Sequence, residues 1–189
     1  MNLKEKIDIL TLLFSKPNDF IKERIKDKTM GEMLETAFPT ISFDEFFNEE
    51  FIKETLDKIE KDYTYLFIGA SSPLASPYES SYYRKESRLM DKPARDQIKL
   101  MIKWGLELEE DFNDLPDHIV SKLSIISVLL EHKENVEEVE LKREIDKDIE
   151  NITKDLTWIE KFVEKIEKNE EGKFYSKIGK ALINTLGEI

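Results

Sequence analysis

Two short segments carry the residues whose types could do chemistry. Glu79 and Ser80 close the run Pro77-Tyr78-Glu79-Ser80, and Asp117 and His118 close the run Pro116-Asp117-His118. Carboxylate, hydroxyl and imidazole groups serve acid–base catalysis, metal binding and hydrogen-bonded recognition alike. Each also has a structural interpretation. Glu79 and Ser80 could cap a helix that starts nearby, Asp117 could complement a helix dipole, and His118 could simply pack.

The wider sequence offers no partners for catalysis or metal binding. Absence of cysteine excludes disulfides, iron–sulfur ligation and thiol chemistry. If the two histidines, His118 and His132, lie on one helix, they are about 21 Å apart and cannot share a metal ion. No glycine-rich phosphate loop and no zinc-protease, serine-hydrolase or calcium-loop motif occurs. We therefore expect no catalytic activity, cofactor or metal. A nucleotide-dependent enzyme is a minor alternative that an assay of Mg-GTP turnover would test.

Composition limits the partners and the compartment. The chain has 189 residues and a formal net charge of −12, which argues against general nucleic-acid binding. No apolar run approaches the length of a membrane span, and the N-terminus lacks the pattern of a signal peptide. We expect a cytoplasmic protein without membrane insertion.

Helical periodicity dominates the chain and predicts how the polar segments are held. Apolar residues recur at helical spacing over 3–14, over 52–66 up to Gly69, and over 174–186, whereas 119–130 is apolar on nearly every side and is typical of a central core helix. No segment alternates with the period of a strand. We predict an all-α fold, with residues 1–189 forming a single globular multi-helix bundle. A Pro- and Ser-rich loop near 70–80, flanked by aromatic residues, is expected to be irregular.

The region from 131 onward allows two interpretations. Seven apolar residues between Ile145 and Ile166 step by four and three, as in a coiled-coil seam. They could instead form one long amphipathic helix packed on the domain. The seam interpretation gives an alternative function, a generic helical interaction module that binds a partner helix through 145–166. A dimer formed in that way should dissociate when Ile152 and Ile159 become lysine. The acidic segment near 131–140 is a candidate hinge.

Three separated segments resemble the TorD/DmsD/NarJ family of cytoplasmic chaperones for molybdenum-containing redox enzymes. Residues 63–69, YTYLFIG, are similar to the family's Y-x-x-L-F-x-G, and 77–82, PYESSY, match its P-Y-E-S-x-Y. Residues 116–119, PDHI, match its P-D-H-I helix start, and the apolar tail from Phe174 is similar to its last element. The resemblance runs from about residue 45 to the end.

The resemblance implies an all-helical chaperone without catalytic activity. Such a protein would bind the twin-arginine leader or N-terminal region of an apo molybdopterin oxidoreductase, delay its export and hold it ready for cofactor insertion. Homodimers, including swapped ones, occur in the family. Some members are described as binding guanine nucleotide, but no phosphate loop here supports that.

Carried over residue by residue, the resemblance also implies a peptide-binding site. Apolar groups at 66, 67, 77 and 78 would receive the hydrophobic part of a leader, Glu79 and Asp117 would pair with its arginines, and Ser80 and His118 would hydrogen-bond its backbone. We hypothesise that the loop and the start of the 117–130 helix form two walls of one groove. The implied site comprises Leu66, Phe67, Pro77, Tyr78, Glu79, Ser80, Pro116, Asp117 and His118.

Overall fold

The computed structural model describes residues 1–83, 92–107, 115–169 and 172–189. These residues are helical with short connections, and no strand occurs among them, as the sequence predicts. The helices are α1 (Leu3–Phe14), α2 (Asp19–Lys26), α3 (Thr29–Ala37), α4 (Asp44–Phe47), α5 (Ile52–Tyr63), α6 (Lys92–Lys103), α7 (Ile119–Asn135), α8 (Val139–Lys154), α9 (Trp158–Glu167) and α10 (Lys173–Leu186). Three short turns complete them: a π turn, η1 (Thr64–Ile68), and two 3-10 turns, η2 (Glu79–Tyr82) and η3 (Asp155–Thr157).

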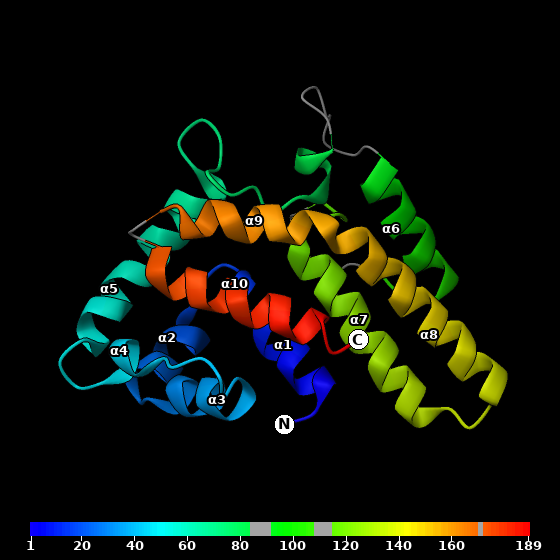
Figure 1. Cartoon of the computed structure of the whole chain (residues 1–189), viewed down its shortest axis with the longest axis horizontal. Coiled ribbons are helices and arrows are strands. Elements are labelled where there is room, and N and C mark those ends of the chain that lie inside the picture. Colours follow the sequence, from blue (N-terminus) through cyan, green and yellow to red (C-terminus); the bar gives the residue numbers. More distant parts are fainter. Residues whose placement is uncertain (84–91, 108–114, 170–171) are drawn as a thin grey trace.

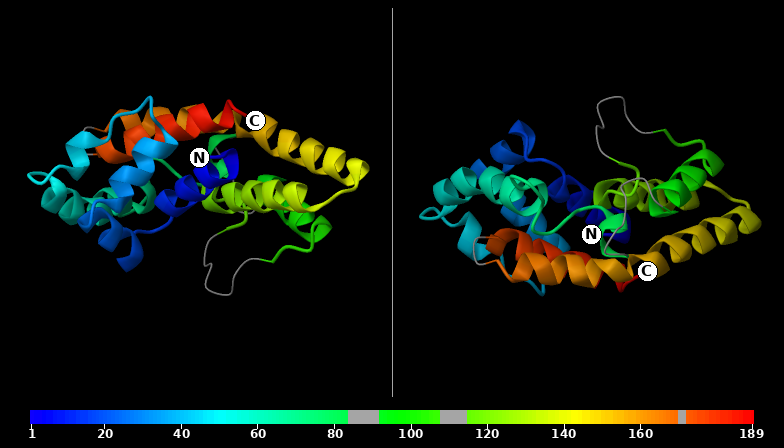
Figure 2. Two further views of the ribbon diagram at one scale, coloured as in Figure 1. Left: turned by 90° about the horizontal axis from the view of Figure 1, so that it is seen from below. Right: turned by 90° about the horizontal axis from the view of Figure 1, so that it is seen from above.

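The helices form two layers, which the views along the layers separate clearly (Figure 2). One layer holds α8, α9 and α10, and the other holds α1, α6 and α7, while α2 to α5 gather at one end (Figure 1). Helix α7 lies along α1 on one side and contacts α8 on another. Most of α7 is buried, as expected of the apolar 119–130 segment. The two termini lie near each other, where the Lys6 ammonium group binds Glu188 at 2.7 Å.

An aromatic cluster forms the centre of the core. The ring of Phe67 lies 5.1 Å from those of Tyr63 and Tyr175 and 5.7 Å from that of Phe162, measured between centroids. Phe14 of α1 joins the cluster through Phe162, at 5.6 Å. These contacts tie α1, η1, α9 and α10 together, so the end of the 52–66 helix is fixed from several sides.

The helix predicted to run to Gly69 does end there, but its last turn differs from a regular α-helix. Residues 64–68 form a π turn, closed by a 2.8 Å hydrogen bond from the Gly69 amide to the Thr64 carbonyl. The wider turn allows two consecutive side chains, Leu66 and Phe67, to face the core together. Gly69 has φ +65°, and a Cβ there would lie 2.1 Å from the Ser72 carbonyl oxygen, so only glycine fits.

The 145–166 segment is two helices, not one. The backbone kinks at Leu156 (φ −81°, ψ 15°), and all seven seam residues, on both sides of the kink, are buried in the chain's own core. Just before the kink the Thr153 hydroxyl donates to the carbonyls of Ile149 and Glu150, a pattern that bends helices. The seam is therefore part of the core, and it is not free to bind a partner helix.

Candidate functional site

The two polar segments of the sequence meet in one junction. An isolated antiparallel bridge pairs Tyr78 with His118. The Ile119 amide donates to the Pro77 carbonyl at 2.9 Å, and the Glu79 amide donates to the Asp117 carbonyl at 3.1 Å. The predicted proximity of the loop and the helix start is thus seen, but the arrangement differs from the hypothesis. The segments are joined directly by backbone hydrogen bonds, and they cannot form opposite walls of a groove.

Asp117 and His118 serve this junction and the start of α7. The Asp117 side chain is fully buried, and its Oδ2 accepts a 3.0 Å hydrogen bond from the Ser80 amide. His118 is the N-cap of α7, where its Nδ1 accepts from the Val120 amide at 3.1 Å. Its ring lies edge-on against that of Tyr78, with 5.1 Å between centroids. Together with the Pro77 carbonyl, these contacts satisfy amides that a helix start leaves without partners.

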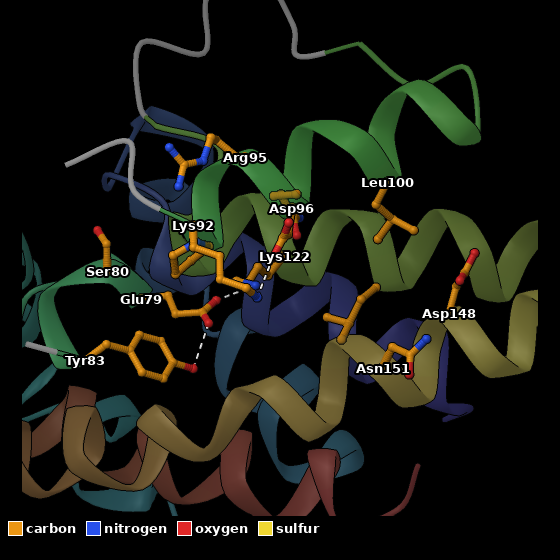
Figure 3. A pocket seen from close by; sticks show the side chains of 13 residues that line it. Glu79, Ser80, Tyr83, Lys92, Arg95, Asp96, Leu100, Lys122, Asp148 and Asn151 are labelled. Atoms are coloured by element: carbon orange, nitrogen blue, oxygen red, sulfur yellow. Dashed lines mark hydrogen bonds and ion pairs between the residues drawn. The ribbon is translucent and has the colours of Figure 1, made fainter. Parts of the chain in front are cut away.

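Glu79 also has partners within the chain. Its carboxylate lies 2.5 Å from the Lys122 ammonium group, and the two side chains are only 3% and 5% exposed. The Tyr83 hydroxyl donates to Glu79 Oε1 at 2.8 Å (Figure 3). The implied pairing of Glu79 with a client arginine would therefore have to break contacts that already exist. Asp117 has one carboxylate oxygen, Oδ1, without a hydrogen-bond partner among the described residues, but the residue is fully buried. The N-cap of η2 is Tyr78, which makes no side-chain cap hydrogen bond, so the capping role considered for Glu79 and Ser80 is not seen among the described residues.

Sequence reasoning missed Lys122. It is the single charged residue between Ile119 and Leu130, in a segment that is otherwise apolar or small. Lysine is almost never fully buried unless it is paired. A lysine inside a core helix therefore signals a buried carboxylate partner, and this signal could have pointed to Glu79.

The proposed roles of Leu66 and Phe67 are corrected by the structure. Both side chains lie in the aromatic core, Leu66 with no exposed surface and Phe67 nearly enclosed, and neither faces a surface that could receive a peptide. Leu66 is the last residue of the apolar stripe over 52–66, so its burial could have been predicted from the sequence. Pro77 and Pro116 are buried beside the junction as well, while Tyr78 is half-buried.

A cavity of about 670 Å³ lies beside the junction. Its lining comes from η2, α6, α7 and α8, and Figure 3 shows the side chains converging from these elements. Of the implied site residues, Glu79 and Ser80 line it. The other lining residues are Tyr83, Lys92, Pro93, Arg95, Asp96, Gln97, Leu100, Lys122, Asp148, Asn151 and Ile152.

The carboxylates of the cavity are neutralised from within the chain. Asp96 accepts hydrogen bonds from Lys92 at 2.7 Å and Lys99 at 3.0 Å, and these bonds hold the pKa of the Asp96 carboxyl below its usual range. Asp148 lies 2.5 Å from the Lys103 ammonium group and accepts from the Trp104 indole at 2.8 Å. Among the described residues, no group of three potential metal ligands is close enough to hold an ion.

Two neutral groups in the cavity lining are buried without a hydrogen-bond partner in the described part of the chain: the Ser80 hydroxyl and the Gln97 side-chain amide nitrogen. Sequence reasoning missed Gln97, although a signal existed. It is the chain's one glutamine, and it lies at helical spacing between the buried residues Ala94 and Met101.

The model of the nitrate reductase delta subunit family matches residues 29–164, a span that includes both segments of the junction. The chain belongs to this family. Two curated relatives are named chaperone protein TorD: one from Vibrio parahaemolyticus, 28% identical over 128 residues, and one from Vibrio atlanticus, 29% identical over 131 residues. Each match covers 67% of this chain but only 60% of the relative.

A solved structure shows the same fold as this family member. A protein from Archaeoglobus fulgidus, described as a candidate redox enzyme maturation protein, superposes with a TM-score of 0.62 at 19% identity. The match covers 97% of this chain and 95% of that one. The curated relatives are named chaperones rather than enzymes, which agrees with the expectation of no catalytic activity.

Proposed function

We propose that this chain is a cytoplasmic, non-catalytic chaperone. It binds the twin-arginine leader or N-terminal region of an apo molybdenum-containing oxidoreductase and assists the enzyme's maturation before export. Family membership and the names of the curated relatives support the chaperone role. The client and the compartment come from the family resemblance. Among the described residues, no helix has the length and apolar character needed to cross a bilayer.

The observation that carries the proposal is the cavity beside the junction. Two segments that lie 37 residues apart in the chain are bonded together, and the first of them supplies Glu79 and Ser80 to the cavity lining. Large, well-formed cavities with a few converging polar groups are the usual place for a ligand. In this proposal Asp117, His118, Pro77 and Pro116 hold the cavity wall in place, and the client segment enters the cavity itself.

The proposal treats residues 1–189 as one domain with a hinge near 131–140. That hinge would include the three residues 136–138, which connect α7 to α8. The proposed homodimer would exchange elements across this connection. Sedimentation equilibrium, run with and without a lengthened 136–138 connection, tests it. A change in the distribution between monomer and dimer is expected, and a monomer at all concentrations in both variants would contradict it.

Binding can be tested with a pair of matched surface substitutions. Asn151 is exposed and lines the cavity, whereas Asn184 is exposed on α10 and does not. The two variants Asn151→Trp and Asn184→Trp add the same bulk in different places. The measurement is isothermal titration of a leader peptide from the molybdenum reductase encoded nearest to this chain's gene. We expect Asn151→Trp to weaken binding at least about tenfold and Asn184→Trp to leave it unchanged.

Either of two results would reject the proposal. The first is that no leader or N-terminal segment of the apo reductase binds the unmodified chain. The second is that both tryptophan variants bind as tightly as the unmodified chain, because the cavity would then play no part in recognition. Thermal unfolding of both variants confirms that each retains the fold.

A further inference from the structure

The cavity beside the junction contains two buried hydrogen-bonding groups that the described part of the chain leaves without partners. Ser80 is 2% exposed and Gln97 is 3% exposed. Both residues line the cavity, and the Ser80 hydroxyl and the Gln97 amide nitrogen are buried without a partner among the described residues. Buried polar groups in native proteins are nearly always paired, so each unmet group calls for a partner from outside the described residues.

The carboxylates of the same cavity, in contrast, already have partners within the chain. Each lining carboxylate already binds a basic group: Glu79 binds Lys122, Asp96 binds Lys92, and Asp148 binds Lys103. The lining holds three acidic residues (Glu79, Asp96, Asp148) and three basic ones (Lys92, Arg95, Lys122), so its formal charge is balanced. A charged ligand would therefore gain little from the cavity as a whole.

An arginine would meet a specific obstacle. To bind Glu79, its guanidinium group would have to displace the Lys122 ammonium group, which is 5% exposed. The displaced ammonium group would then be buried without a counter-charge, which is strongly unfavourable. The Glu79–Lys122 pair therefore excludes arginine from this part of the cavity.

The remaining lining suits an uncharged chain. Leu100, Ile152 and Pro93 contribute apolar surface next to the two unpartnered groups. The hydroxyl of Ser80 and the amide nitrogen of Gln97 are both donors, and their natural complement is a carbonyl oxygen. A peptide in extended conformation offers such carbonyls together with side chains that apolar surface can cover.

We propose that Ser80 and Gln97 donate hydrogen bonds to main-chain carbonyls of an uncharged segment of the client, so that the client's arginines lie outside the cavity. This inference rests on the proposed function and names the part of the client that the cavity recognises. Gln97 and Ser80 are then the specificity-determining residues, and the Glu79–Lys122 pair acts as a filter against arginine.

The test compares two synthetic peptides on three forms of the full chain. One peptide is the reductase leader with its two arginines, and the other carries glutamine at both positions. Calorimetric titration measures the affinity of each peptide for the unmodified chain, for Gln97→Leu and for Ser80→Ala. We expect the two peptides to bind the unmodified chain within about threefold of each other. Each substitution should weaken both peptides by about tenfold, the effect of losing one buried hydrogen bond.

The melting temperature of Gln97→Leu distinguishes a binding role of Gln97 from a merely structural one, because the two roles predict changes in opposite directions. Gln97→Leu removes a buried amide nitrogen that has no partner in the described part of the chain, so its melting temperature should equal or exceed that of the unmodified chain. A lower melting temperature together with unchanged affinity would assign Gln97 to the core and overturn the inference.

The outcomes separate this inference from the proposed function. Loss of binding on replacing the arginines by glutamine, or unchanged affinity in Gln97→Leu and Ser80→Ala, overturns the inference while leaving the chaperone function in place. Failure of both peptides to bind the unmodified chain overturns the proposed function and, with it, the inference.

Discussion

The carboxylate of Asp117 accepts a hydrogen bond from the backbone amide of Ser80 at 3.0 Å, linking a loop to a helix start that lies 37 residues further along the chain. Because the acceptor is fully buried, removing it should be costly. We expect Asp117→Ala to lower the free energy of unfolding by about 2–3 kcal/mol, and Asp117→Asn, which keeps an acceptor oxygen, by less. Urea unfolding measures both. Equal stability of Asp117→Ala and the unmodified chain would show that the bond does not hold the junction.

Because Lys122 and Glu79 form a buried ion pair, we expect the stability losses from replacing each of them to be non-additive. Lys122→Met leaves a carboxylate buried with the Tyr83 hydroxyl as its remaining partner, so it should cost about 3–5 kcal/mol of stability. Glu79→Leu alone should cost a similar amount. The double variant should recover much of the loss, because neither charge then remains unpaired. A double-mutant cycle on urea unfolding measures the coupling, and additive losses would contradict the pairing.

Gly69 and Gly105 offer a matched test of backbone constraint. Both have positive φ, +65° and +63°, but a Cβ at Gly69 would lie 2.1 Å from the Ser72 carbonyl oxygen, whereas a Cβ at Gly105 meets none of the described residues within 4 Å. Gly105→Ala should cost about 1–2 kcal/mol, the strain of a left-handed alanine. Gly69→Ala should cost distinctly more, since the loop must also move. Equal losses in chemical unfolding would mean that the loop is not held closely against Gly69.

Two buried tyrosines predict a loss of stability at alkaline pH. Burial raises the pKa of the Tyr82 hydroxyl, and burial followed by the neighbouring Tyr63 and Asp62 raises that of Tyr175 well above its usual value. An unfolded tyrosine ionises near pH ~10, so above that pH the unfolded state loses protons that the folded state keeps. Stability should therefore be fully present below about pH 10 and should fall as the pH rises toward the folded-state pKa values.

Substituting these tyrosines identifies their contribution. Tyr175→Phe should flatten the alkaline loss and be neutral or stabilising by up to ~1 kcal/mol at neutral pH, since its hydroxyl is buried without a partner among the described residues. Tyr82→Phe should flatten the loss but cost about 1 kcal/mol at neutral pH, because its hydroxyl donates to the Ser76 carbonyl at 2.7 Å. Tyr65→Phe, at an exposed ring, is the control. An unchanged alkaline profile in both test variants would exclude the buried hydroxyls as its cause.

Because the seam residues are buried in the core, replacing them by lysine should destabilise the fold, whereas in a coiled-coil dimer it would dissociate the two chains. Ile152 and Ile159 lie in the core on either side of the kink at Leu156. Lysine at either position should lower the free energy of unfolding by more than about 4 kcal/mol, because an unpaired charge enters the core. Circular dichroism and thermal unfolding measure this loss. A stably folded Ile152→Lys variant that only loses self-association would restore the seam as an interface.

Helical periodicity alone predicted most of the fold. The apolar 119–130 segment is the buried helix α7, the long stripe does end at Gly69, and no strand occurs in the described residues. Periodicity could not reveal the π turn after Tyr63 or the kink at Leu156. Both are local changes of the backbone that keep apolar residues in contact with the core. The shape of the core depends on elements far away in the sequence, so local periodicity does not predict these changes.

The candidate site was less predictable because the same residue types serve recognition and structure. The sequence correctly predicted that residues 77–80 and 116–118 lie together. The spacing of these residues could not show which hydrogen-bond partners each would have within the chain. Glu79 and Asp117 therefore seemed free for arginines, although both have partners within the chain. Gln97 lies on helix α6 and belongs to no sequence motif.

The most direct measurement is photo-crosslinking from the cavity to a client. A photoreactive amino acid at Asn151, in the cavity lining, is compared with the same amino acid at the exposed Asn184 of α10 in the presence of the apo reductase. We predict crosslinks from position 151, mapped by mass spectrometry to the uncharged part of the reductase's leader or N-terminal region, and none from position 184. Crosslinks from position 184 alone, or from position 151 only to parts of the reductase outside that region, would contradict the proposed site.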